Sequence, residues 1–141
     1  MVHLSAIGAD EGAASLYART KELLLIQDFI RSHISGDIYV ADGELPGGNS
    51  RIIVMNSEGQ FLRQWSMFRT NSDQDITPLP HCLRLSNDGL VYVCDRQADR
   101  IQVFDRDGNF LRNIFLKKIG PYLFYSPVVG NKKLIITGLS F

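Results

Sequence analysis

Residues 89–95, Gly-Leu-Val-Tyr-Val-Cys-Asp, decide the fold, because residues 36–42 repeat them as Gly-Asp-Ile-Tyr-Val-Ala-Asp. Further along the chain, residues 100–112 repeat residues 51–63 with the same order of apolar and turn residues. The two alignments differ in offset by four residues, and the whole difference lies in the loop between the paired segments. A surface loop tolerates such a length change, so the chain contains an internal repeat.

The second copy contains the signals of four antiparallel strands. Runs of β-branched and aromatic residues alternate with turns that carry Asp-Gly, whose glycine supplies the positive φ that a tight hairpin needs. We expect these strands at residues 81–85, 89–94, 101–104 and 109–115. Four strands in about 35 residues are the size of one propeller blade.

The first copy predicts a similar blade, because the last three of its strands are equally clear. They are expected at residues 37–41, 51–55 and 60–65. Residues 30–35 stand where the opening strand belongs, although apolar and polar side chains do not alternate cleanly there.

The two ends of the chain depart from the repeat. Residues 122–126 and 133–137 predict two more strands, joined by a loop at residues 127–132, which would make half of a third blade. Near the N-terminus, residues 10–24 have apolar residues at helical spacing and Asp10 in a capping position, which favours a helix. A strand at residues 21–29 is the alternative.

The sequence therefore predicts an all-β fold, a partial, open β-propeller of two blades plus part of a third, with a short N-terminal helix. A closed propeller carries about four to eight blades, and each blade needs a neighbour on both faces. We therefore expect missing blades or self-association. The expected segments are an N-terminal extension, a first blade, a linker, a second blade and a partial third blade, at residues 1–30, 31–69, 70–79, 80–116 and 117–141.

The composition argues against some classes of binding partner. The 15 basic and 15 acidic residues cancel to a net charge of zero, which argues against binding of nucleic acid or of an anionic membrane surface. The sequence contains no apolar run of about 18 residues, so no transmembrane helix is expected. The first residues lack the basic start of a secretory signal, which favours a cytoplasmic chain or one that has lost its N-terminus.

The two cysteines, Cys82 and Cys94, fall in neighbouring strands of one expected hairpin. A three-residue loop between these strands would make them face each other, and a two-residue loop would put them on opposite faces. The sequence favours two buried thiols, with a disulfide as the alternative.

The strings at residues 91–96 and 99–105 resemble an NHL repeat, and the resemblance covers roughly residues 34–116. NHL proteins are usually six-bladed propellers, so this resemblance implies blades around a central channel. Residues 42–52, 80–83 and 94–96 together are similar to the peptidyl-hydroxyglycine amidating lyase and to bacterial NHL proteins like it. That likeness implies a secreted or periplasmic parent protein.

The resemblance also implies a site. In the lyase, three histidines from different blades hold a zinc ion in the channel, and an arginine helps to hold the substrate. His81 matches the first zinc histidine, Arg51 matches the arginine, and Leu83 matches a position whose backbone carbonyl holds a structural calcium. However, Glu44 stands where the lyase has an aromatic residue, and no histidine follows His81. A catalytic zinc needs three protein ligands and an open position, so one chain cannot supply this site.

The residues also have plainer interpretations. Arg51 and Arg100 occupy the same repeat position, which favours a structural pairing with Asp42 or Asp95 near the strand ends. His81 could line the channel without binding a metal. The sequence therefore predicts an NHL-repeat module that binds or scaffolds a protein or peptide and is not catalytic as a single chain. The alternative is a zinc-dependent enzyme of the amidating-lyase type; an RNA-binding surface is disfavoured by the neutral charge.

Overall fold

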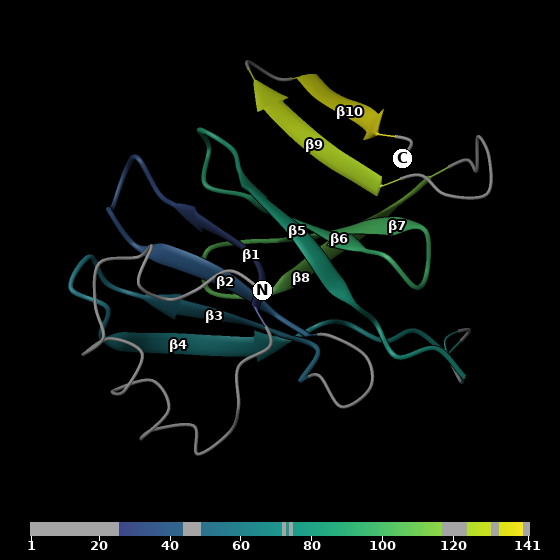
Figure 1. The fold of residues 1–141 in the computed structure, drawn as a ribbon, viewed down its shortest axis with the longest axis horizontal. Coiled ribbons are helices and arrows are strands. Elements are labelled where there is room, and N and C mark those ends of the chain that lie inside the picture. Colours follow the sequence, from purple (N-terminus) through teal and green to yellow (C-terminus); the bar gives the residue numbers. More distant parts are fainter. Residues whose placement is uncertain are drawn as a thin grey trace.

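The computed structural model describes residues 26–43, 49–71, 73 and 75–116, and the backbone of residues 124–130 and 133–139. The described strands form two four-stranded sheets and one two-stranded sheet, all antiparallel (Figure 1). The helix expected at residues 10–24 lies outside the described residues. None of the described segments is a helix long and apolar enough to cross a membrane.

Each four-stranded sheet follows chain order, as a propeller blade does. The first blade contains β1 (Ile26–Arg31), β2 (Ile38–Asp42), β3 (Arg51–Met55) and β4 (Phe61–Ser66). The second contains β5 (Pro80–Leu85), β6 (Val91–Asp95), β7 (Arg100–Phe104) and β8 (Phe110–Phe115). The partial, open propeller predicted from the sequence is confirmed.

The two blades also have their strand-register shifts at the same repeat positions. In β1 the pairing with β2 skips Gln27, and in β5 the pairing with β6 skips His81. A second register shift comes just before Met55 in the first blade and just before Phe104 in the second. A bulge bends its strand and redirects a side chain, and the two sheets share the positions of these irregularities as well as the strand order.

The first strand begins earlier than expected. The prediction of an opening strand at residues 30–35 was wrong, since β1 ends at Arg31 and residues 33–35 form a turn. The Ser32 hydroxyl fixes this turn by accepting hydrogen bonds from the backbone N–H groups of Ile34 and Ser35, at 3.3 and 3.2 Å. The first blade therefore starts inside the segment that was assigned to the N-terminal extension.

The last hairpin also differs in detail. Strand β9 (Phe124–Gly130) pairs with β10 (Lys133–Leu139) over its full length, so the prediction of a loop at residues 127–132 was wrong. Pro127 lies within β9, opposite Ile136. Proline donates no ladder hydrogen bond and occurs in strands only where its nitrogen needs no partner strand, which explains why the sequence indicated a loop.

The two blades stack face to face, and opposite faces of the repeat meet. The first blade contributes Tyr39 and Ala41 to the shared core, whereas the second contributes Val91 and Val93. In repeat numbering, Val93 is the counterpart of Val40, which points to the other face of the first blade. The contact is therefore head-to-tail, the kind that generates rings when its rotation closes.

Aromatic residues fill the seam between the two blades. The Trp65 ring lies 6.4 Å from the Tyr39 ring and 5.9 Å from the Phe104 ring, between centroids. Phe104 also meets Phe110 edge-on at 5.9 Å. Tilted and edge-to-face contacts of this kind add to the burial of apolar area, so Trp65 on β4 is a main contact of the first blade with the second.

The far face of the second blade carries a separate apolar cluster, next to the third hairpin. Strand β9 contacts β5 and β6, and Figure 1 shows the β9–β10 hairpin on the side of β5 away from the first blade. The cluster includes a disulfide between Cys82 and Cys94, whose Cα atoms are 5.0 Å apart. The expectation of two buried thiols was wrong, because the hairpin has the three-residue loop, between Ser86 and Leu90, that makes the cysteines face each other.

Substitution of Gly108 tests the stacking. Gly108 has a φ of +89°, and a Cβ atom there would lie 2.5 Å from Cδ2 of Trp65. We expect Gly108→Ala to lower the free energy of unfolding by about 1–2 kcal/mol for the backbone strain and about 1–3 kcal/mol more for the clash. Urea unfolding followed by the fluorescence of Trp65 measures this.

Gly36 is the matched control. Its φ is +78°, but the atom nearest to an added Cβ is the Ser57 Cβ, at 3.8 Å. Gly36→Ala should therefore lower the free energy of unfolding only by the cost of the backbone strain, without the cost of a clash. Equal losses of stability in the two variants would contradict the contact between Gly108 and Trp65.

Candidate functional site

Arg51 lies at the start of β3, directly opposite Asp42 at the end of β2. Its Nε donates to Oδ2 of Asp42 at 2.7 Å, and its Nη1 donates to Oε1 of Gln64 at 3.2 Å. Both charged side chains are buried, at 8% and 0% exposure. The guanidinium thus joins the ends of β2, β3 and β4, and its pairing with Asp42 is the one predicted from the shared repeat position of Arg51 and Arg100.

Arg100 does the same in the second blade and also holds the linker. Its Nε donates to Oδ2 of Asp95 at 2.8 Å, and its terminal nitrogens reach both carboxylate oxygens of Asp73, at 3.2 and 2.9 Å. The Phe68 carbonyl accepts a hydrogen bond from Arg100 at 3.3 Å and another from the buried amide of Gln102 at 2.7 Å. Asp73 was missed in the sequence, because a single acidic residue in a polar linker carries no signal of its partner.

An unusual backbone conformation places each arginine. The residue before Arg51 is Ser50, with a φ of +50°, and the residue before Arg100 is Asp99, with a φ of +46°. Their carbonyls accept hydrogen bonds from the N–H groups of Met67 and Leu116, both at 2.9 Å. Left-handed conformations are uncommon outside glycine, so their recurrence at one repeat position shows that the turn into the arginine strand is a fixed part of the blade.

The Asp73 carboxylate is stabilised in its charged form. A hydrogen bond from the backbone N–H of Thr70, at 2.7 Å, is the largest cause that lowers the pKa of Asp73 below its usual value, and the Arg100 guanidinium lowers it further. Burial acts in the opposite direction but does not win. The linker between the blades is therefore fastened by a charged group that stays ionised at neutral pH.

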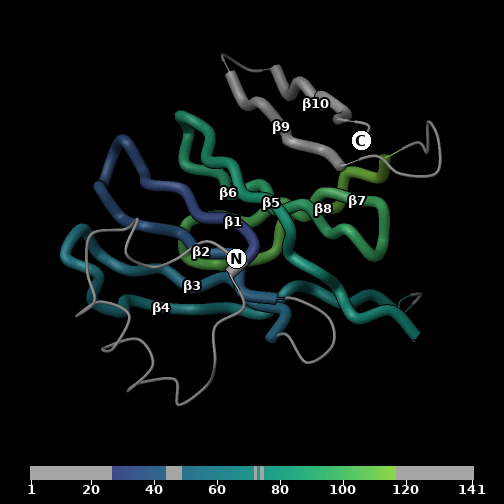
Figure 2. Tube along the Cα trace, viewed as in Figure 1, coloured from purple at the N-terminus to yellow at the C-terminus, as the bar shows by residue number. Residues whose placement is uncertain are grey.

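His81 lies at the bulge of β5, between Pro80 and Cys82, and its side chain is half-buried. Strand β5 contacts β1, so the first strands of the two blades lie side by side (Figure 2). No group of three or more histidine, cysteine, aspartate or glutamate side chains that could hold a metal occurs within the described part of the chain. The described residues do not by themselves fit a zinc site, and the zinc role of His81 stays a prediction.

Leu83 is buried, and its backbone is engaged by neighbouring side chains. Its N–H donates to Oδ2 of Asp28 on β1 at 2.9 Å, and its carbonyl accepts a hydrogen bond from Nη1 of Arg84. The same Arg84 nitrogen lies 3.1 Å from Oδ2 of Asp28. The Leu83 carbonyl and the Asp28 carboxylate, oxygens of the kind that calcium binds, thus contact a guanidinium in this structure, and the calcium role of Leu83 stays a prediction.

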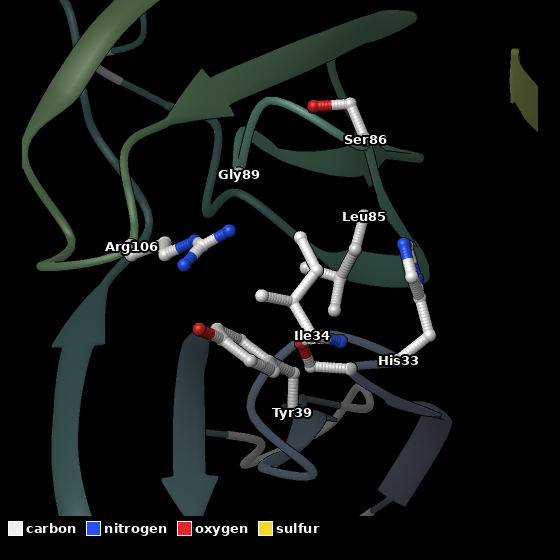
Figure 3. Close-up of a pocket in the computed structure, with 8 residues that line it drawn as sticks. His33, Ile34, Tyr39, Leu85, Ser86, Gly89 and Arg106 are labelled. Carbon is white, nitrogen blue, oxygen red and sulfur yellow. Dashed lines mark hydrogen bonds between the residues drawn. The ribbon is translucent and has the colours of Figure 1, made fainter.

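A small recess opens at the other end of the blade seam (Figure 3). The space that a water-sized group can occupy there is about 10 Å³, far less than the about 300–1,000 Å³ of clefts for small molecules. It lies at the hairpin turns, away from Arg51 and His81. The lining residues come from both blades and are Ser32, His33, Ile34, Tyr39, Leu85, Ser86, Gly89 and Arg106.

Comparison with known proteins agrees with this architecture. The family model named NHL repeat matches residues 77–104, which span β5, β6 and β7 of the second blade. The chain belongs to the NHL-repeat family.

The curated NHL relatives are longer proteins. The chain is 37% identical over 73 residues to NHL repeat-containing protein 3 of Homo sapiens, a match that covers 52% of this chain and 20% of the relative. It is 32% identical over 73 residues to the Mus musculus protein of the same name, with the same coverage. It is 34% identical over 102 residues to peptidyl-glycine alpha-amidating monooxygenase B of Xenopus laevis, covering 67% of this chain and 11% of that protein. The chain thus spans a fifth or less of the length of these relatives.

Within the NHL repeats, the Arg51 and Arg100 pairings are structural in both blades. The substrate-holding role that the lyase resemblance implies for Arg51 stays a prediction. The Arg51 side chain that would perform it is 8% exposed, and its guanidinium donates hydrogen bonds to Asp42 and Gln64.

The linker contact predicts a pH-dependent stability. Because the pKa of Asp73 is lower in the folded state than its ordinary value of 3.8, its carboxylate stabilises the fold above that value and loses this effect as the pH falls through the folded pKa. We expect Asp73→Asn to reduce the free energy of unfolding at pH 7 and to differ much less from the wild type near pH 3. Urea titrations at both values measure the difference.

Asp75, an exposed carboxyl in the same linker, provides the control. Asp75→Asn should leave the stability nearly unchanged at both pH values. A loss in Asp73→Asn that has the same size at pH 7 and pH 3 would contradict the ionised contact.

Proposed function

We propose that this chain is an NHL-repeat propeller module that binds or scaffolds a protein or peptide and is not catalytic as a single chain. The head-to-tail stacking of the first blade on the second is the observation that carries the proposal. A contact between unlike faces leaves each end of an arc ready for a further blade. The partner is therefore polypeptide that supplies further blades, either another copy of this chain or blades of other sequence.

The outer strands support a binding role. Leu62 on β4 and Leu111 on β8 occupy the same repeat position and are 44% and 47% exposed. Phe115, at the end of β8, is 72% exposed. Apolar side chains that recur on the rim of successive blades offer a surface for protein contacts, whereas the buried Arg51 and Arg100 offer none.

Sedimentation velocity tests the need for further blades. If copies of the chain supply them, the purified protein should sediment as a species larger than the monomer, in a proportion that rises with concentration. If blades of other sequence supply them, the chain alone should aggregate or unfold at low urea concentration. A stable, cooperative monomer at all concentrations would overturn the proposal.

The second candidate is a zinc-dependent enzyme of the peptidyl-hydroxyglycine amidating-lyase type. The observation that favours it is the 34% identity over 102 residues with peptidyl-glycine alpha-amidating monooxygenase B, together with the position of His81 on β5, the first strand of the second blade. Such a site would require ligands from other copies or other blades, because a catalytic zinc takes three protein ligands.

Zinc content separates the two candidates. We expect no stoichiometric zinc in protein purified from zinc-supplemented buffer and dialysed, by elemental analysis. If the wild type and His33→Ala contain one zinc ion per chain or per ring and His81→Ala contains none, the enzyme is favoured over the binding module. His33 is a matched control, since it lies exposed in the turn at the opposite end of the blade.

A further inference from the structure

We propose that the recess between the two blades is a binding site for an oxyanion, a carboxylate or phosphate oxygen held between Arg106 and the Tyr39 hydroxyl. The recess lies at the hairpin turns, so it is separate from the blade ends that carry Arg51 and His81. The proposal does not depend on the propeller module's protein partner.

Arg106 lines this recess with a positively charged guanidinium whose N–H groups are not used by the described residues. Its guanidinium lies against Gly89, where a Cβ atom would come within 2.3 Å of Nε and 2.8 Å of Nη2. Figure 3 shows the guanidinium pointing into the space above Tyr39. Among the residues that the structure describes, none accepts a hydrogen bond from it, so all five N–H donors of its fork remain for a ligand or for water.

The Tyr39 hydroxyl is oriented as a donor. Its oxygen accepts a hydrogen bond from Nη2 of Arg63 at 3.1 Å, and Arg63 is held in turn by the Arg106 carbonyl, which accepts from its Nε at 2.8 Å. Since the oxygen already accepts, its own proton is free to be donated. Burial raises the pKa of Tyr39, so the hydroxyl keeps this proton at neutral pH.

The lining restricts what can enter. The Ser32 and Ser86 hydroxyls are already used within their own turns. Ile34 and Leu85 form an apolar wall, and the space left admits little more than one water-sized group. A ligand would therefore place a single terminal oxygen between Arg106 and Tyr39 and leave the rest of its structure outside.

Of the four charged side chains near this recess, Arg63, Arg106, Asp37 and Asp88, only Arg106 lines it. The guanidinium groups of Arg63 and Arg106 both act on the Tyr39 hydroxyl, with Asp37 the carboxylate that acts on it in the opposite direction. The Asp88 carboxylate, beside Gly89, accepts a hydrogen bond from the Ser86 hydroxyl. Charge-assisted bonds from a guanidinium to an oxyanion are among the stronger hydrogen bonds in proteins.

The repeat shows that Arg106 is not needed to build the turn. Its counterpart in the first blade is Ser57, and that turn closes in the same way: Asn56 Oδ1 accepts from the backbone of residues 58 and 60, as Asp105 Oδ1 does from residues 107 and 109. Gly36, the counterpart of Gly89, faces only the Ser57 side chain, at 3.8 Å from an added Cβ. The pairing of Gly89 with an arginine is thus particular to the second blade, where the recess lies.

Titration of the intact chain with anions, followed by the amide signals in an NMR spectrum, tests the proposal. Acetate and inorganic phosphate are the two probes, in buffer without other oxyanions. We expect saturable shifts confined to residues 32–34, 39, 85–90 and 106, which weaken as sodium chloride is raised. Saturation by acetate alone assigns a carboxylate ligand, and saturation by phosphate alone assigns a phosphate.

Variants separate the recess from general charge effects. Arg106→Gln should weaken binding at least about tenfold, and Tyr39→Phe should weaken it several-fold while the ring keeps its packing. Arg112→Gln is the control, because Arg112 is the exposed counterpart of Arg63 in the second blade. The unfolding midpoint of each variant confirms that it folds. No saturable shift with either anion, or equal binding by Arg106→Gln and the wild type, would overturn the proposal.

Discussion

The head-to-tail contact between blade faces is the constraint on which this structure depends. A four-stranded sheet has two apolar faces, and neither can be left in water without losing the hydrophobic free energy that folding requires. Here the Tyr39 face of the first blade buries the Val93 face of the second, and Trp65 and Phe104 fill the seam. The second blade then uses its other face, with Cys82 and Cys94, toward the β9–β10 hairpin. Each blade is thus stabilised by its neighbours.

Buried ion pairs fix the ends of the blades that this packing aligns. A buried arginine and carboxylate gain little net stability, because both lose their hydration, but removal of one partner leaves a costly unpaired charge. Arg51 with Asp42, and Arg100 with Asp95 and Asp73, therefore specify how the strands end and how the linker crosses between blades. The same geometry leaves these arginines poorly placed to meet a ligand, in contrast to Arg106, whose guanidinium is exposed at the opposite end of the seam.

The repeat explains which features could be predicted from the sequence. Strands β2 to β8 and the two Asp–Arg pairs were predictable because two copies gave the same period, turn glycines and charged positions. The start of β1 was not, since the bulge at Gln27 breaks the alternation on which strand prediction relies. The disulfide depended on a loop length that the sequence left open. The contacts of Asp73 with Arg100 and of Asp28 with Arg84 join residues far apart in the chain, and no local pattern marks them.

Nuclear Overhauser effects from the Trp65 indole ring test the stacking most directly, because the chain contains one tryptophan and its signals are unambiguous. The structure predicts cross-peaks from the indole ring to the Gly108 Hα protons and to the Phe104 ring, which belong to the other blade. If the indole protons show cross-peaks only to residues of the first blade, the two sheets do not pack as described and the head-to-tail arrangement is contradicted.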